Sequence, residues 1–263
     1  MKCHCYETDS EFIFCVEDVG NAQLEEVIKH MAWNKLEGKF VRPYPLSAFS
    51  NQNEKECISD NFSRLGQVMF ESSVSGFDWK KSLDLIAQHF LENEIEWFIV
   101  GSICDAIRGV NVQPFDIDII VHTKDFLKVK DICNSAFPEA IIAPFDTQGT
   151  LYLQYFGRMF LAGAMIEIVA DERWNPEYRQ CEKSIWRDNG YTQPEYVKTV
   201  WHGHEIYVES LQHRHQAETK RNRMDRIKAI EEYMDLHQIN FFCKPCQLKE
   251  WSHVCSKSTL RWC

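Results

Sequence analysis

The spacing of apolar residues divides the chain into a less specific first stretch, residues 1–77, and a patterned second stretch, residues 78–236. In the first stretch, an aromatic and β-branched run is typical of a strand, and apolar residues recur at helical spacing on either side of a proline-broken segment. The pattern predicts a strand over 11–16, helices over 22–31 and 61–71, and a polar loop over 47–60. We therefore expect a small α+β module at the N-terminus.

The second stretch alternates short apolar runs with amphipathic segments. The pattern predicts helices over 79–93, 103–108 and 211–236, and strands over 97–100, 115–121, 165–169 and 204–208. Within strand 115–121, Asp116 and Asp118 are two residues apart and project from one face, whereas Phe115, Ile117 and Ile119 are expected to point into a core. The long last helix should carry a basic, solvated side that includes Arg214 and Arg226. Residues 237–263 remain as a cysteine-rich tail.

Composition and charge exclude several classes of protein. The chain has 263 residues, 44% of them hydrophobic, and a formal net charge of −10, which is the balance of a globular protein. No apolar run approaches the ~20 residues that a membrane-spanning helix needs, and the first residues lack the apolar core of a secretory signal. The acidic balance argues against non-specific binding of nucleic acid, which requires a basic excess. We expect a cytoplasmic protein without a membrane partner.

The 11 cysteines are an odd number, so they cannot all pair within the chain, and free thiols in a reducing compartment are expected. Four of them lie in the tail. The spacing of Cys243 and Cys246 is that of a zinc half-site, and Cys255 and Cys263 follow, so that a zinc site can be assembled from the four. Free thiols packed against the tail tryptophans are the alternative.

The candidate chemistry lies in three carboxylates placed among apolar strand residues. Asp116, Asp118 and Glu167 would be costly to bury unless they were paired or bound a cation, and Mg²⁺ prefers oxygen ligands of this kind. Upstream, Gly101 and Ser102 follow a strand and offer backbone N–H groups and a hydroxyl to a phosphate. The alternatives are that the aspartates solvate an edge strand and that Glu167 is a structural ion-pair residue.

Taken in order, these motifs resemble the polymerase-β-type nucleotidyltransferase superfamily, and in particular the stand-alone bacterial nucleotidyltransferase-domain proteins related to antibiotic nucleotidyltransferases and CCA-adding enzymes. The resemblance rests on three pieces: Val100-Gly101-Ser102 followed by Ile107-Arg108-Gly109, Pro114-Phe115-Asp116-Ile117-Asp118-Ile119, and Met165-Ile166-Glu167-Ile168-Val169. It covers roughly residues 82–232. Cys104-Asp105 departs from the Arg-Asp pair of the CCA-adding pattern, which weakens a role in tRNA maturation.

The resemblance implies an α+β nucleotidyltransferase fold, a mixed sheet flanked by helices, for residues 78–236. It further implies that Gly101 and Ser102 hold the phosphates of a nucleoside triphosphate such as ATP, and that Asp116, Asp118 and Glu167 are catalytic and bind Mg²⁺ or Mn²⁺. Lys220 and Arg223 would neutralise the triphosphate, unless they merely belong to a solvated helix face. The implied reaction moves a nucleoside monophosphate to an acceptor hydroxyl and releases pyrophosphate.

Two functions remain open at this point. The first is an active nucleotidyltransferase whose acceptor is a small molecule, a protein or an RNA end. The alternative is a non-catalytic member of the same fold that binds a nucleotide or a partner. The sequence does not select the acceptor or the nucleotide.

Overall fold

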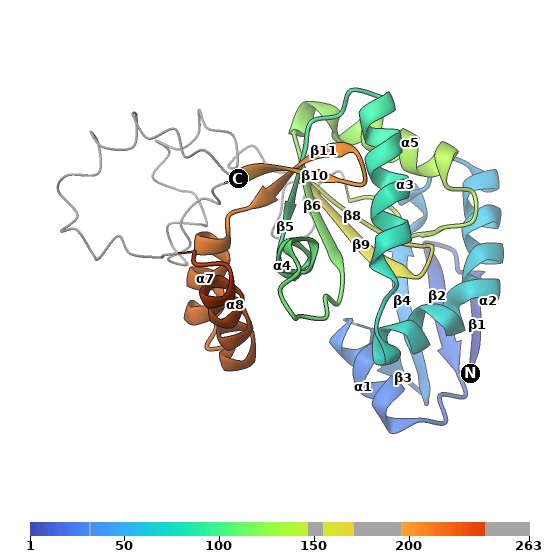
Figure 1. Cartoon of the computed structure of the whole chain (residues 1–263). Coiled ribbons are helices and arrows are strands. Elements are labelled where there is room, and N and C mark those ends of the chain that lie inside the picture. The colour runs from blue at the N-terminus through green and yellow to red at the C-terminus, as the bar shows by residue number, and fades with distance from the viewer. Residues whose placement is uncertain (32, 147–154, 171–195, 240–263) are drawn as a thin grey trace, which may run out of the picture.

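The computed structural model describes residues 1–31, 33–146, 155–170 and 196–239, and Figure 1 shows how their helices and strands are arranged. The strands are β1 (Lys2–Glu7), β2 (Glu11–Glu17), β3 (Asn34–Leu36), β4 (Lys39–Pro45), β5 (Trp97–Val100), β6 (Ile117–Val121), β7 (Ile141–Ile142), β8 (Tyr155–Leu161), β9 (Ala164–Ala170), β10 (Tyr196–Trp201) and β11 (His204–Glu209). The α-helices are α1 (Ala22–His30), α2 (Gln52–Ser75), α3 (Trp79–Glu92), α4 (Ser102–Arg108), α5 (Phe126–Ala136), α7 (Leu211–Lys220) and α8 (Met224–Leu236). The fold class is α+β, as the sequence predicts.

The N-terminal residues form an antiparallel sheet in the order β1-β2-β4-β3, drawn in blue in Figure 1. Its inner face is apolar because strand side chains alternate: Phe12, Phe14 and Val16 are buried, and they belong to the same hydrophobic core as residues of the second sheet. Helix α2 contacts β1 on one side and β7 and β9 on the other. It therefore joins the N-terminal sheet to the rest of the molecule.

Helix α2 begins at Gln52, so the predicted loop over 47–60 is wrong for most of its length. The polar residues there start a helix: the Asn51 side chain accepts a hydrogen bond from the Glu54 N–H (2.9 Å), and the Glu54 carboxylate accepts one from the Ser50 N–H. These reciprocal bonds satisfy backbone N–H groups that have no partner within the first turn of a helix. Because the bonds involve polar side chains, the spacing of apolar residues does not reveal them.

A second, seven-stranded sheet has the order β10-β11-β5-β6-β9-β8-β7 among the described residues. Strand β6 lies inside it, antiparallel to β5 and parallel to β9, so the alternative of an edge strand for the aspartates is wrong. Ile117 and Ile119 are fully buried as predicted. Phe115 is 62% exposed, because it lies two residues before β6, which begins only at Ile117, and so does not follow the strand alternation.

The predicted single helix over 211–236 is two helices, α7 and α8, separated by residues 221–223. Asn222 adopts the left-handed conformation there (φ 54°), which ends the helical run. The basic side predicted for this segment is also wrong in part. Arg214 is 1% exposed and Arg226 is 8% exposed, because both turn inward instead of facing solvent.

Among the helices that the structure describes, none has the length and apolar character that crossing a membrane requires.

Candidate active site

The three predicted carboxylates meet at the centre of the seven-stranded sheet. Asp116 directly precedes β6, Asp118 lies in β6, and Glu167 lies opposite Asp118 in the parallel strand β9. Carboxylate oxygens of all three lie within 4.8 Å of one another. Parallel pairing at this register places Asp118 and Glu167 side by side, and the two-residue spacing adds Asp116 on the same face.

Burial and mutual repulsion shape the protonation of the two aspartates. Desolvation, together with the charge of Glu167, raises the pKa of Asp116 from 3.8 to about 6. Desolvation and the charge of Asp116 also raise the pKa of Asp118 well above its usual value. Neither aspartate carboxylate takes a hydrogen bond or an ion pair from a residue that the structure describes. Two such groups, half-buried and without partners, form a site that a divalent cation would stabilise.

Glu167 differs from the aspartates because a cation already contacts it. Arg158 stands opposite Glu167 in the antiparallel pair of β8 and β9, and its Nε donates to Glu167 Oε1 at 2.8 Å, with a second bond from Nη2 to the same oxygen. Glu167 thus forms the ion pair that the alternative interpretation predicts, through one of its two carboxylate oxygens. Sequence reasoning did not find Arg158, because nothing in the motif pattern pairs residue 158 with residue 167.

The turn after β5 lies directly against the carboxylates. Gly101 has a φ of 77°, and a Cβ built on it would lie 2.6 Å from Asp118 Oδ2, so no other residue fits without displacing that carboxylate. Ser102 follows as the first residue of α4 and is 8% exposed. Its hydroxyl makes no hydrogen bond with the residues that the structure describes. Gly101 and Ser102 are therefore placed beside the acidic cluster, as the motif predicts.

A buried network of polar side chains holds the Gly101–Ser102 turn in place. The Gly101 N–H donates to Glu209 Oε2 (3.0 Å), the last residue of β11, and Glu209 Oε1 pairs with His213. The network also holds the pKa of Glu209 below its usual value, although burial alone would raise that pKa: bonds from His213, the charge of Arg214 and the Gly101 N–H together outweigh the desolvation.

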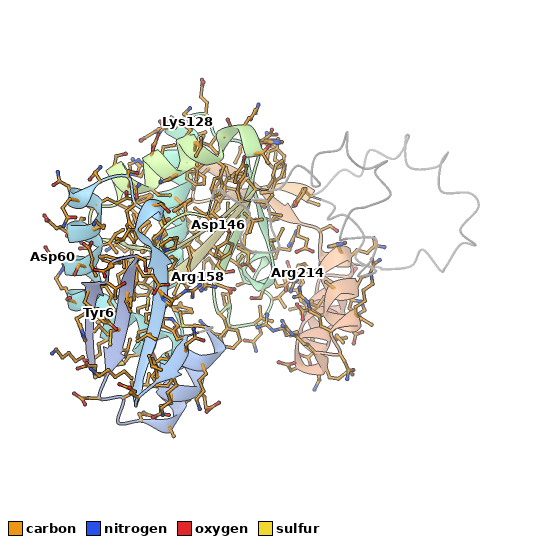
Figure 2. The ribbon with its side chains drawn as sticks, turned by 180° about the vertical axis from the view of Figure 1, so that it is seen from behind. Tyr6, Asp60, Lys128, Asp146, Arg158 and Arg214 are labelled. Atoms are coloured by element: carbon orange, nitrogen blue, oxygen red, sulfur yellow. The ribbon has the colours of Figure 1, made fainter. Side chains whose placement is uncertain are left out.

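Arg214 links this network to the helix that follows the glycine turn. Its Nε and Nη2 donate to Asp105 Oδ2 at 3.1 and 3.0 Å, Nη2 also pairs with Glu218, and Nη1 lies 3.8 Å from Glu209 Oε2. Asp105, in α4, and Glu218 are fully buried. In Figure 2, Arg214 lies on the side of the molecule that carries α7 and α8. Asp105, which follows the cysteine at which the motif departs from the CCA-adding pattern, therefore anchors α4 to α7.

The two predicted triphosphate ligands are not equally near the carboxylates. Arg223, together with Arg226 and Arg158, contributes an electrostatic effect that lowers the pKa of Asp116, so its charge acts on the cluster. Its Nη1 lies 3.6 Å from Glu218 Oε2, and its side chain is 49% exposed. Lys220 ends α7 and is exposed, which agrees with the solvated-face alternative.

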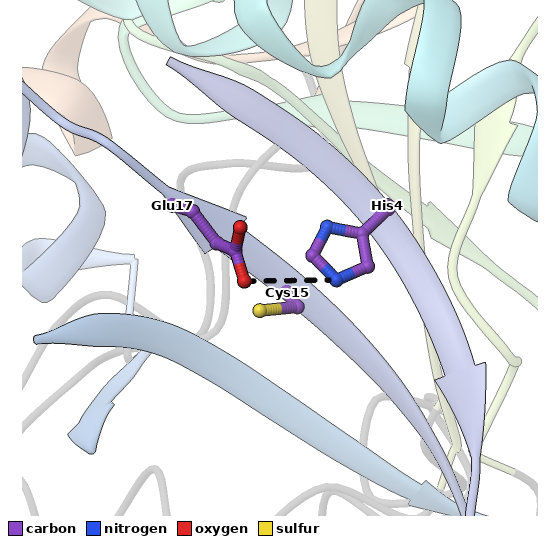
Figure 3. Close-up of side chains that lie close together, drawn as sticks. All are labelled: His4, Cys15 and Glu17. Carbon is purple, nitrogen blue, oxygen red and sulfur yellow. Dashed lines mark ion pairs between the residues drawn. The ribbon is translucent and has the colours of Figure 1, made fainter. Parts of the chain in front are cut away.

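Residue types that bind metals also occur in two other groups, the tail cysteines and a cluster on the N-terminal sheet. The predicted zinc residues Cys243, Cys246, Cys255 and Cys263 lie outside the described residues. A second cluster lies on the N-terminal sheet, where His4 stands opposite Cys15 and Glu17 follows on the same strand as Cys15 (Figure 3). There, His4 Nε2 lies 4.0 Å from Glu17 Oε1, while Lys39 Nζ binds the same oxygen at 2.5 Å. This carboxylate thus already has a cationic partner.

The chain is similar to several solved structures but matches no protein-family model. No curated protein matches it either. Among solved structures, it resembles a Thermotoga maritima protein described as a nucleotidyltransferase, with 19% identity, a TM-score of 0.39 and coverage of 60% of this chain and 94% of that one. It also resembles an antigenic nucleotidyltransferase-like protein from Paracoccidioides brasiliensis, with 15% identity, a TM-score of 0.38 and coverage of 59% and 76%.

A third structure with a similar likeness is ANT(2")-Ia in complex with adenylyl-2"-tobramycin, with 9% identity, a TM-score of 0.40 and coverage of 60% of this chain and 91% of that one. The descriptions of these three structures name a nucleotidyltransferase, a nucleotidyltransferase-like protein and ANT(2")-Ia. Nothing about the reaction of this chain follows from identities and TM-scores at this level. A function for it has to be argued from its own site.

Proposed function

We propose that the chain is a divalent-metal-dependent nucleotidyltransferase, which moves a nucleoside monophosphate from a nucleoside triphosphate to an acceptor hydroxyl and releases pyrophosphate. One observation carries the proposal: Asp116, Asp118 and Glu167 converge within 4.8 Å beside a Gly101–Ser102 turn, where a Cβ at Gly101 would lie 2.6 Å from Asp118 Oδ2. A phosphate-binding turn against a carboxylate cluster is the arrangement that metal-assisted phosphoryl chemistry requires.

The residues present fit Mg²⁺ or Mn²⁺. All three candidate ligands supply hard carboxylate oxygens, and the two aspartates have no hydrogen-bonding partner among the described residues that a metal would have to displace. Burial and, after it, the repulsion between neighbouring carboxylates raise the pKa values of both aspartates, and a dication would offset both effects. When bound, the metal supplies charge neutralisation for the triphosphate and its leaving group.

The chain's own residues have separate tasks in the proposed reaction. Ser102 offers a hydroxyl and an N–H to the terminal phosphates, while the Gly101 N–H is held by Glu209 and shapes the turn instead of binding the nucleotide. The acceptor oxygen forms a bond to the α-phosphorus as the bond from that phosphorus to pyrophosphate breaks. In this proposal Glu167 accepts the hydroxyl proton on Oε2, which takes no hydrogen bond from the described residues.

Thermal unfolding of the full chain with ATP, GTP, CTP or UTP, each with and without Mg²⁺, tests the proposal. We expect at least one nucleotide to stabilise the fold in a Mg²⁺-dependent manner, because mass action favours the state that binds. Asp118→Asn should remove the Mg²⁺-dependent part, whereas Asp60→Asn, on the exposed side of α2, should keep it.

Pyrophosphate release separates catalysis from binding. The active enzyme should release pyrophosphate from the stabilising nucleotide when a small-molecule extract is added, and Asp118→Asn should not. Mg²⁺-dependent binding without release from any extract would favour the non-catalytic alternative, and no stabilisation by any nucleotide would refute both. The tail zinc site stays a separate prediction, which metal analysis of the purified chain would test.

A further inference from the structure

A cavity of about 370 Å³ lies between the N-terminal sheet and the edge of the seven-stranded sheet, within the size range of small-molecule sites. Residues of β4 and the turn after it line one wall, and residues around β7 and β8 line the other. Arg158 belongs to this lining and is also the residue that contacts Glu167. Figure 2 labels Arg158 and Asp146, which lie near one another on this side. The cavity is thus one side chain away from the third carboxylate.

Arg158, a lining residue of the cavity, has one donor without an acceptor among the residues that the structure describes. Its Nε and Nη2 both donate to Glu167, whereas the buried Nη1 has no hydrogen-bond partner in that part of the chain. A buried guanidinium nitrogen without an acceptor is costly, since the protein has withdrawn it from water without replacing the bond. An oxygen of an anionic ligand is the acceptor that a guanidinium binds best.

The charges of the cavity favour the same kind of ligand. Among the described residues that line it, Arg42, Lys130 and Arg158 are cationic and Asp146 is the one carboxylate. Because Arg158 is paired with Glu167, Arg42 and Lys130 supply the excess of positive charge. Arg42 donates from Nη1 to the Met31 carbonyl (3.0 Å), which holds its charge at the wall without neutralising it. The excess of positive charge would repel a polycation.

The remaining walls are largely apolar and aromatic. Four rings line the cavity, and two of them face the arginines: the Arg158 guanidinium lies 5.4 Å from the Phe156 ring centre, and the Arg42 guanidinium lies 5.7 Å from that of Tyr44. Phe49 and Phe145 supply the others. Such walls suit a flat or apolar body, with the anionic group directed at the guanidinium.

We propose that this cavity holds the acceptor, and that the acceptor is a small molecule with a carboxylate or phosphate group on an aromatic or apolar body. The inference rests on the proposed nucleotidyl transfer, which needs an acceptor next to the carboxylate that takes its proton. It deepens that function by excluding polycationic acceptors: the Arg158 Nη1 donor, Arg42 and Lys130 select an anion. Arg158 acts here as a binding and positioning residue for the acceptor.

Ligand-observed NMR with the full chain in EDTA tests the cavity without the metal site. The probes are phenyl phosphate and benzoate, which separate the two anionic groups, and benzylammonium, which carries the same ring with a positive charge. We expect one or both anions to bind and benzylammonium to bind at least ~10-fold more weakly.

Two lysines of α5 provide matched variants. Lys130 lines the cavity, whereas the exposed Lys128 on the same helix donates to the Asn93 carbonyl and points away in Figure 2. Lys130→Gln should weaken the bound anion several-fold, on the order of 5-fold, and Lys128→Gln should leave its affinity unchanged. Arg158→Met should abolish binding, with circular dichroism to verify the fold.

The outcomes separate this inference from the proposed function. Anion binding that depends on Lys130 and persists with saturating nucleotide and Mg²⁺ supports the acceptor site. Preferred binding of benzylammonium, or anion binding that nucleotide displaces and Lys130→Gln does not change, overturns it. Failure of every nucleotide to stabilise the chain, measured separately, would refute nucleotidyl transfer while leaving the anion-binding cavity itself established.

Discussion

The burial of the candidate metal ligand Asp116 beside the charge of Glu167 makes a quantitative prediction about stability and pH. Asp116 has a pKa of about 6 in the folded protein against 3.8 in its ordinary state. Because the folded pKa is raised, the contribution of this group to stability is complete below about pH 3.8 and is lost as the pH rises through about 6. Linkage gives a cost of about 1.6 kcal/mol at pH 5 and about 3 kcal/mol at pH 8 for the protein without a divalent cation.

Asp116→Asn removes the charge at every pH, so the variant should gain stability relative to the wild type as the pH rises. Between pH 5 and pH 8, the difference in free energy of unfolding between variant and wild type should shift by about 1.4 kcal/mol in favour of the variant. The raised pKa of Asp118 would add to this shift, because its ionisation becomes easier once the neighbouring charge is gone. Any constant cost of the buried amide cancels in this comparison.

The measurement is urea unfolding of both proteins in EDTA at pH 5 and pH 8, with Asp60→Asn, exposed on α2, as the control. The control should show no shift of this kind. Millimolar Mg²⁺ should then stabilise the wild type at pH 8 more than Asp116→Asn, since it binds the folded carboxylates. A variant whose advantage over the wild type is equal at both pH values would refute the claim that burial and the charge of Glu167 raise the pKa of Asp116 in the folded protein.

Four further substitutions test the glycine turn, the buried arginine network and a buried hydrogen bond outside the candidate site. Gly101→Ala should cost about 1–3 kcal/mol through its positive φ and abolish Mg²⁺-dependent stabilisation by nucleotide, because its Cβ displaces Asp118. Gly109→Ala is the control, because Gly109 also has a positive φ (94°) but has open space where the Cβ would lie. This variant should lose stability through backbone strain and keep the Mg²⁺-dependent stabilisation by nucleotide. Equal loss of that stabilisation in both variants would contradict a specific contact between the Gly101 Cβ and Asp118. Arg214→Met should cost about 3–5 kcal/mol in urea unfolding, because its buried carboxylate partners lose their cation, and a cost below 1 kcal/mol would exclude that role. Ser82→Ala, which breaks a buried bond to a carbonyl, should cost about 1–2 kcal/mol without changing nucleotide binding in the same thermal assay.

Local sequence determined the elements that carry the candidate site. The strand over 97–100 and the glycine turn after it are where the pattern predicts them, since a short apolar run bounded by glycine encodes its own limits. The two-residue spacing of Asp116 and Asp118 also fixes a shared face without reference to any other part of the chain. Where local signals compete, as at residues 47–60 and 221–223, periodicity alone gave the wrong element, because caps and left-handed residues act over one turn of helix.

Only the tertiary structure decided which groups surround the carboxylates. The contact between Arg158 and Glu167 depends on the register of two strands, and the bond from Gly101 to Glu209 joins residues 108 positions apart. The inward turn of Arg214 likewise depends on a buried aspartate in α4, without which the same arginine would face solvent. Sequence spacing specifies the face on which a side chain lies within its own element. The partner across that face is set by packing and strand register, which are properties of the whole fold.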